Sequence, residues 1–192
     1  MDKRKFFKDI LNIHDERILK KFCRLSAVET YKKGTYLITK GESQGSLFFL
    51  VEGILRGFWG NPKGKEATEC FVFRYGQAAL GSYRLDQPPS VNVAAETNST
   101  IVKLPKQAVE ELLLQHTELV YVYNELLIRE MEEHQNIKHA IYMLNAKERY
   151  NWFLREYKDL IDRVSHRHVA SFLNMTPVTL SRLRKEFREQ EE

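Results

Sequence analysis

The side chains best suited to chemistry in this chain of 192 residues are polar and basic groups near its C-terminus. Thr176, Thr179, Ser181 and Arg182 follow one another at helical spacing. Hydroxyl and guanidinium groups can donate hydrogen bonds to base edges and to phosphate oxygens. Between Pro177 and Arg188 four cations stand against one glutamate, a local charge of +3. The pattern favours contact with DNA.

Two short helices joined by a tight turn are expected to position these residues. Ser165 is a suitable N-cap for the first helix, Asn174 and Met175 would form the turn, and Thr176-Pro177 is typical of an N-cap followed by the first helical residue. In the second helix the residues expected to face inward are Val178, Leu180, Leu183 and Phe187. A helix–turn–helix fits this pattern. An ordinary helix pair with a solvated basic face fits it too.

Other site chemistries lack the residues that they need. The two cysteines, Cys23 and Cys70, are 47 positions apart and have no CxxC spacing. Among the six histidines, His166 and His168 are two apart, a spacing that does not bind a metal on one helical face. No GxSxG, HExxH or phosphate-binding glycine loop occurs, and the glycine-rich region holds no histidine for haem or for a cupin-like site. The sequence predicts no metal, no cofactor and no enzyme.

Charge and hydropathy limit where the protein can be located and what it can bind. The net charge is only +4, so the distribution of charge matters more than its total. The longest apolar run, near Leu47–Val51, has the length of a strand, and about 18 apolar residues are needed to cross a bilayer. The charged N-terminus is not followed by an apolar signal core. We expect a cytoplasmic protein that does not engage a membrane.

The glycines mark a boundary between two kinds of structure. All nine lie between Gly34 and Gly81, and none lies in the 111 residues that follow. Glycine favours tight turns and is costly inside helices, so a β region followed by a helical region is expected. Short strands at this spacing indicate an antiparallel barrel or sandwich. The expected strands are Tyr36–Ile38, Ser46–Val51, Ile54–Trp59, Cys70–Phe73, Val91–Ala95 and Thr100–Leu104, with a turn at Gly60–Gly64.

Helical periodicity appears on both sides of the β region. Asp2–Arg24 has helical apolar spacing, and Lys147–Tyr157 is amphipathic. Glu118–Asn145 contains no Gly or Pro and predicts one long helix. Its apolar stripe, interrupted by Glu130, consists of Val120, Tyr123, Leu127, His134, Ile137, Ile141 and Leu144. A partner helix in a homodimer would cover this stripe. Packing on the chain's own barrel is the alternative.

Several motifs together resemble the Crp–Fnr transcription regulators. His168–Arg184 resembles their winged helix–turn–helix, and the Ala-x-x-Arg-Tyr-x-x-Phe-Leu pattern that precedes it is present as Ala146–Leu154. Their cyclic-nucleotide-binding β-roll is similar to Lys33–Ile38, Lys40–Glu42 and Leu47–Gly53. The resemblance implies an α+β fold: an antiparallel β-roll sensor at 1–117, a dimerisation helix at 118–145, and a winged helix–turn–helix at 146–192. Few residues follow Arg188, so the wing is expected to be missing or reduced.

The resemblance also assigns residues to a DNA interface. The assigned residues are Ser165, Arg167, His168, Thr176, Pro177, Val178, Thr179, Ser181, Arg182 and Lys185. Arg182 occupies the most regular basic position of the family. Pro177 and Val178 stand where the catabolite activator has an arginine and a glutamate, so its operator is not expected to transfer to this chain.

The resemblance places a cyclic-nucleotide site where this chain lacks the key side chains. Ala78-Ala79 stands in place of the family's Gly-Glu pair, and Pro89-Ser90-Val91 in place of Arg-Ser/Thr-Ala. Each lost charge-assisted bond costs on the order of 1.5–3 kcal/mol, so neither cyclic AMP nor cyclic GMP is expected to bind. Residues that are candidates for a substitute ligand are Gly81, Ser82, Tyr83, Arg84, Ser90 and Asn92.

The sequence therefore predicts a homodimeric transcription regulator that binds a pseudo-palindromic site on double-stranded DNA. RNA polymerase and an unknown small-molecule effector are further candidate partners. The alternative is a sensor protein that binds a cyclic nucleotide or another small ligand and does not regulate DNA by itself. The sequence does not give the operator, the regulated genes, or whether the protein activates or represses.

Overall fold

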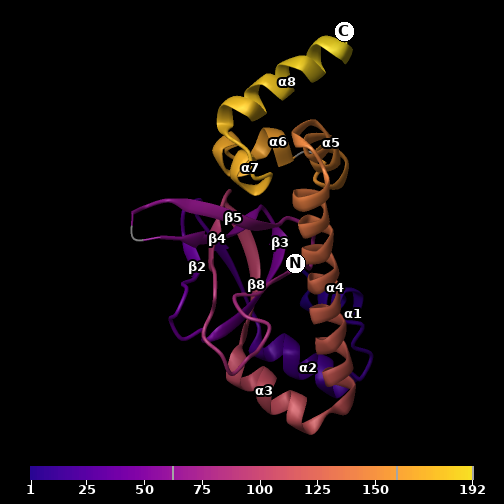
Figure 1. Ribbon diagram of the computed structural model, residues 1–192. Coiled ribbons are helices and arrows are strands. Elements are labelled where there is room, and N and C mark those ends of the chain that lie inside the picture. The colour runs from indigo at the N-terminus through magenta and orange to yellow at the C-terminus, as the bar shows by residue number, and fades with distance from the viewer. Residues whose placement is uncertain (62, 159, 192) are drawn as a thin grey trace. The chain divides into compact units, whose positions relative to one another are not determined.

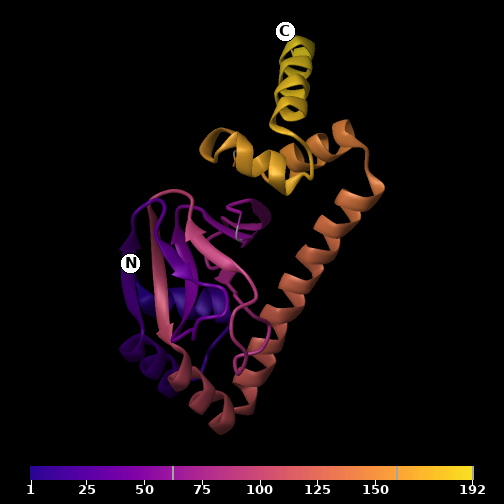
Figure 2. The same ribbon diagram turned by 60° about the vertical axis from the view of Figure 1, so that its left-hand side comes forward.

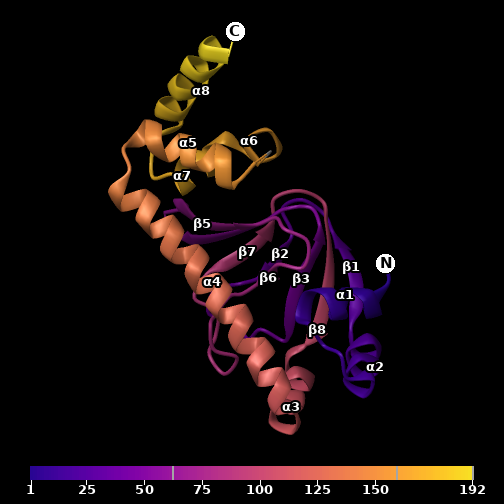
Figure 3. The ribbon, with the colours of Figure 1, turned by 90° about the vertical axis from the view of Figure 1, so that its right-hand side faces the viewer.

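The computed structural model describes residues 1–61, 63–158 and 160–191. The chain divides into two compact units, residues 1–57 with 71–130, and residues 58–70 with 131–192. Figure 1 labels the helices and most of the strands, and Figure 3 labels β1, β6 and β7. The helices are α1 (Lys3–Leu11), α2 (Glu16–Leu25), α3 (Lys106–Gln115), α4 (Thr117–Met143), α5 (Ala146–Glu156), α6 (Leu160–Arg163), α7 (His166–Phe172) and α8 (Pro177–Glu191). No helix within the described ranges has the length and apolarity of a membrane span.

The strands form two antiparallel sheets. One has the order β1-β8-β3-β6 and the other β2-β7-β4-β5. The strands are β1 (Ala27–Tyr31), β2 (Tyr36–Ile38), β3 (Ser46–Glu52), β4 (Leu55–Gly60), β5 (Glu66–Val72), β6 (Ala78–Ala79), β7 (Asn92–Ala95) and β8 (Ser99–Pro105). All six predicted strands are found; β5 begins four residues before the predicted Cys70, and every other end differs by at most one residue. The predicted turn at 60–64 includes Pro62, which lies outside the described residues.

Strands β1 and β6 were not predicted, because their sequences carry no local signal for a strand. β1 pairs along its whole length with β8, from Ala27 opposite Lys103 to Tyr31 opposite Ser99, but no glycine precedes it. β6 has two residues, which pair with Phe48 and Phe49 of β3. Non-local pairing, rather than local sequence, makes both of these segments strands.

Strand β3 is buried on both faces. Leu47 and Phe49 enter an apolar cluster with α1, α2 and α3, whereas Phe48 and Leu50 enter a second cluster with residues of β2, β4 and β7. Neighbouring side chains of a strand point to opposite faces, so the unbroken apolar run of β3 requires cover on both sides. Figures 2 and 3 show α1 and α2 beside the sheet that contains β1, β8 and β3.

The N-terminal segment forms two helices rather than one continuous helix. The Asp2 carboxylate caps α1 by accepting hydrogen bonds from the backbone amides of Arg4 and Lys5. Asn12 ends α1 in a left-handed conformation, with φ of 51°. Asp15 then caps α2. The apolar periodicity continues across this break, which is why it does not reveal the break.

The helix predicted at 118–145 is confirmed as α4, one unbroken helix of 27 residues. The helix predicted at 147–157 is confirmed as α5, which begins at a capping box between Asn145 and Glu148. Every described element from 146 to 191 is a helix. The expected wing is therefore missing from the described part of this region, because α8 continues as a helix of 15 residues where a strand pair would follow.

Gly53 offers a test of the β-roll. It follows β3 with φ of +103°, and a Cβ there would lie 2.3 Å from Ser99 Oγ and 2.7 Å from the Asn98 carbonyl oxygen. Gly53→Ala should lower the free energy of unfolding by about 1–3 kcal/mol, because the backbone is left-handed and both neighbours belong to a tight turn. Urea denaturation measures the change. Gly45→Ala is the control, since a Cβ there meets nothing within 4 Å; equal effects of the two substitutions would contradict the prediction.

Candidate nucleic-acid interface

Helices α7 and α8 form a helix–turn–helix. Asn174 takes the left-handed conformation with φ of 49° and lies in the predicted turn. Its amide donates to the Ser171 carbonyl at 3.1 Å, and the Met175 amide donates to the Ala170 carbonyl at 2.9 Å. These bonds close the turn and set the direction in which α8 leaves it. The predicted helix–turn–helix is confirmed as a structure.

Aromatic side chains pack α7 against α5 and the residue that follows it. The Phe172 ring of α7 lies 5.1 Å from the Tyr157 ring and 5.9 Å from the Phe153 ring, measured between centroids. Leu180 and Leu183 of α8 are buried as predicted. Val178 is 61% exposed, so the expectation that it faces inward is wrong. It precedes Leu180 by two helical positions, which places it on the opposite side of the helix.

The exposed side of α8 presents much of the predicted interface. Thr176, Pro177, Val178, Ser181, Arg182 and Lys185 are exposed, and Thr179 is partly buried. The Thr176 hydroxyl accepts from the Thr179 amide at 3.1 Å and lies 2.9 Å from the Thr179 hydroxyl. Thr176 thus caps α8, as predicted, and its hydroxyl already has intrachain partners.

The cations of α8 have different surroundings. Arg182 makes no hydrogen bond or ion pair with any described residue, so its guanidinium is available to a ligand. Lys185 is 3.7 Å from Glu189 in an exposed pair. Arg184 turns toward Asp162 at 3.1 Å and the His166 ring, and its side chain is 14% exposed. Arg184, which contributed to the local charge of +3, therefore holds α8 to α6 and α7.

The remaining predicted interface residues lie in and before α7. Ser165 precedes α7 without donating or accepting a capping bond through its side chain. Arg167 is exposed, and its Nη2 lies 3.4 Å from Nε2 of His168. These residues belong to the same unit as α8.

Arg149 of α5 holds the turn of the helix–turn–helix. Its Nε donates to the Leu173 carbonyl at 2.8 Å, its Nη1 to the Leu144 carbonyl at 2.7 Å, and its Nη2 to the Asn174 carbonyl at 3.4 Å. One planar cation thus connects the turn before α8 to the segment that follows α4. The sequence pattern included Arg149, but only the structure gives it this role.

Arg149→Lys should loosen α7 and α8 selectively. An ammonium cannot reproduce the guanidinium fork, and a lost bond to a charged donor costs on the order of 1.5–3 kcal/mol. Hydrogen exchange of backbone amides should become faster in 166–185 and stay unchanged in 46–52. Arg155→Lys is the control, because Arg155 is exposed and its one ion pair among the described residues is with its neighbour Glu156. Unchanged protection of α7 and α8 would show that Arg149 is dispensable.

The region that corresponds to a nucleotide cradle is closed by its own hydrogen bonds. Ala78 and Ala79 form β6 and are buried against β3. The Ser90 amide donates to the Gly81 carbonyl at 2.7 Å, and the Gly41 amide donates to the Pro89 carbonyl at 2.9 Å. A bound phosphate needs free amides, and these are engaged within the chain.

The candidate substitute residues are also engaged. Arg84 forms two hydrogen bonds to Asp86, at 2.9 Å and 2.6 Å, and its guanidinium holds the pKa of the Asp86 carboxyl below its usual range. The Ser82 hydroxyl accepts from the Arg84 amide, and the Asn92 side chain accepts from the Lys40 amide. The structure brings Gly81, Ser82 and Ser90 together, whereas Asn92 faces the turn that contains Lys40.

Two features of this unit were missed by sequence reasoning. The Tyr123 hydroxyl of α4 donates to the Tyr83 carbonyl at 3.3 Å, and burial raises the pKa of Tyr123. Arg56 and Glu96 form a buried ion pair, 3.6 Å between Nε and Oε2. A lone arginine in an apolar strand was the only available signal for the second feature. Within the described residues no cluster of three or more His, Cys, Asp or Glu side chains could hold a metal ion.

Comparison with known proteins defines the class of fold. Residues 28–116 match the family profile of the cyclic nucleotide-binding domain. A search of curated protein sequences gives no match to this chain. These residues resemble a domain of cyclic nucleotide-binding type, and the match covers somewhat less than half of the sequence.

Solved structures extend the match to nearly the whole chain. FixK2 from Bradyrhizobium japonicum aligns at TM-score 0.76 and 15% identity, with 86% of each chain covered. A protein from Eubacterium rectale that is assigned to the Crp/Fnr family aligns at TM-score 0.78 and 18% identity, covering 97% of this chain and 88% of that one. The global regulator CLP from Xanthomonas campestris aligns at TM-score 0.71 and 14% identity, covering 92% and 93%. The chain has the fold of Crp–Fnr regulators.

Proposed function

We propose that this protein is a homodimeric transcription regulator of the Crp–Fnr type that binds double-stranded DNA. The observation that carries the proposal is the exposed Arg182 on α8, which has no partner among the described residues. A guanidinium without an intrachain partner, on the second helix of a helix–turn–helix, suits guanine or phosphate recognition in a major groove. The proposal includes a cytoplasmic location, with RNA polymerase as a further partner, and no enzymatic activity.

In this proposal three segments of the chain have separate roles. Residues 1–117 form the sensor, 118–145 the dimerisation helix and 146–192 the DNA-binding segment. In a dimer, the distance between the two copies of α8 sets the half-site spacing on a pseudo-palindromic operator. Ligand or protein contacts that change this distance would change operator affinity.

The surface of α4 supports the homodimer, with a seam that differs from the predicted stripe. Tyr123 and His134 contact their own chain, through Tyr83 and Glu69, and Ile137 is buried. The exposed apolar residues of α4 instead include Val120, Tyr121, Ile128 and Met131. Val120 and Ile128 are separated by two helical turns with Asn124 between them, the spacing at which a second helix can pack.

DNA binding provides the direct test. Fluorescence anisotropy with a pool of random 30-base-pair duplexes should give an affinity that falls steeply between about 50 and 200 mM salt, because phosphate contacts release counterions. Arg182→Ala should weaken binding. A guanine contact predicts a loss of about 1–3 kcal/mol with relaxed specificity on a selected site, and a phosphate contact predicts a salt slope smaller by about 1.

Arg155→Ala is the matched control for this experiment. The substitution removes an exposed cation of α5 that lies outside the predicted interface. The affinity of this variant for DNA should therefore equal that of the wild-type protein. Two chains should bind each selected duplex. Failure of the wild-type protein to bind any duplex would favour the alternative, a sensor without its own DNA regulation.

Cyclic AMP and cyclic GMP should not bind. The cradle amides and Arg84 are occupied within the chain, and a ligand at 100 times its Kd would add about 2.7 kcal/mol of stability. A thermal-shift titration to millimolar nucleotide should therefore leave the Tm unchanged. Cyclic di-GMP, to which the Xanthomonas regulator responds, is included as a further ligand. A dose-dependent rise with cyclic AMP or cyclic GMP would refute this part of the proposal.

A further inference from the structure

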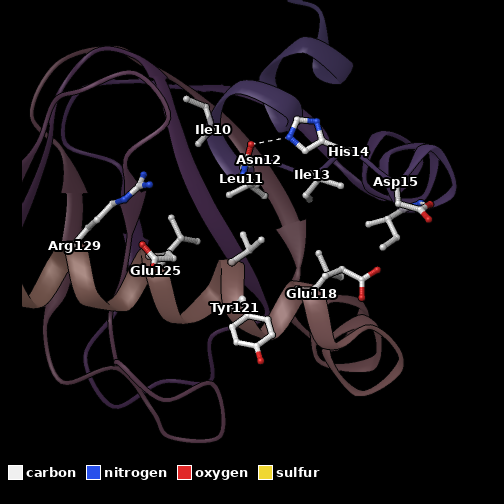
Figure 4. A pocket seen from close by; sticks show the side chains of 14 residues that line it. Ile10, Leu11, Asn12, Ile13, His14, Asp15, Glu118, Tyr121, Glu125 and Arg129 are labelled. Carbon is white, nitrogen blue, oxygen red and sulfur yellow. Dashed lines mark hydrogen bonds between the residues drawn. The ribbon is translucent and has the colours of Figure 1, made fainter.

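A groove lies between the α1–α2 connection and the first half of α4. Its volume is about 550 Å³. Figure 4 shows Leu11, the last residue of α1, and Ile13 of the connection facing α4 across the groove. The floor is apolar, and Leu11, Ile13 and Leu119 in it are each 4–5% exposed members of the main core cluster. Small-molecule pockets have volumes of about 300–1,000 Å³ and a largely apolar lining, so the groove has the size and floor of a ligand site.

The rim of the groove is predominantly acidic. Asp15 comes from the α1–α2 connection, Glu118 and Glu125 come from α4, and Arg129 is the only lysine or arginine in the lining. In the view of Figure 4, Asp15 and Glu118 lie toward one end of the groove, and Glu125 and Arg129 lie toward the other. The charges of the rim therefore favour a positively charged occupant.

The carboxylates of α4 have little intrachain neutralisation. Glu125 makes no hydrogen bond or ion pair with any described residue. Among the described residues Glu118 lies close to the His116 ring, with 3.8 Å between Oε1 and Nδ1. Asp15 is partly neutralised, because it caps α2 and pairs with Arg17 at 3.4 Å. Two carboxylates from one helix are thus free to bind a cation over an apolar floor.

Most of the groove lining lies on a different side of α4 from Val120 and Ile128, and Tyr121 belongs to both surfaces. Glu118, Val122, Glu125 and Arg129 recur at intervals of three or four and line the groove. Val120, Asn124 and Ile128 are displaced from them by about a third of the helix circumference, at 100° per residue. Pairing of two chains along Val120 and Ile128 would leave this side of α4 uncovered.

We propose that this groove is a binding site for a small organic cation with an apolar body, such as an arylalkyl amine. The apolar body packs on Leu11, Ile13 and Val122, and the ammonium group pairs with Glu118 or Glu125. The ligand contacts the α1–α2 connection and α4 at once, so it stabilises their packing. The site does not depend on DNA binding, and its test uses no DNA.

Two probes with one apolar body test the proposal. 4-Phenylbutylamine carries a cation at neutral pH, and 4-phenylbutyrate carries an anion on the same skeleton. Isothermal titration of the full chain should show the amine binding about two- to fivefold more tightly than the acid, because only the amine can form the ion pair and exposed ion pairs are weak. The amine should also raise the Tm of the protein. Equal affinity for the two probes, or no binding of the amine, would overturn the proposal.

Variants locate the site. Glu118→Gln/Glu125→Gln should weaken amine binding about five- to tenfold, and Arg129→Gln should strengthen it about two- to fivefold, because repulsion is removed. Glu132→Gln, which changes an exposed carboxylate of α4 outside the groove, is the matched control and should leave the affinity unchanged. Wild-type affinity in the double variant, or an equal loss in the control, would place the amine elsewhere. Dimer formation displaced by the amine would identify the groove as a contact between chains and overturn the proposal.

Discussion

The burial of strand β3 on both faces is the constraint on which the first unit depends. A strand with Leu47 and Phe49 on one face and Phe48 and Leu50 on the other is stable only when both faces are covered. The second sheet covers one face. The helices α1, α2 and α3 and the first turns of α4 cover the other, through residues such as Phe6, Phe22 and Leu119. The position of α4 on this unit is therefore a consequence of core packing.

Two regions of this unit that were considered above as ligand sites differ in their packing and hydrogen bonding. The loop at 81–90 is closed by backbone bonds and by the Arg84–Asp86 pair, so the amides of Gly41 and Ser90 are engaged within the chain. The space left between the α1–α2 connection and α4 is different in kind. It has an apolar floor and an acidic rim, which suit an apolar cation rather than a phosphate.

In the C-terminal unit some cations hold helices and turns together, and others are exposed to solvent. Arg149 binds three carbonyl oxygens and sets the turn, and Arg184 binds α6 and α7. Arg182, two positions before Arg184, remains exposed without a partner in the described residues. Equal charges in the sequence therefore have unequal roles, because 100° of rotation per residue places them against different neighbours.

The sequence by itself determined the elements whose signals are local. The glycine cluster defined the β region, the absence of Gly and Pro defined α4, and Thr176-Pro177 marked the start of α8. Each of these depends on backbone preferences of a few adjacent residues. Only the tertiary structure decided the break at Asn12, the pairing of β1 and β6, the outward position of Val178, and which cations are free. Those features depend on contacts between residues far apart in the chain, and no local preference encodes which partner a side chain meets.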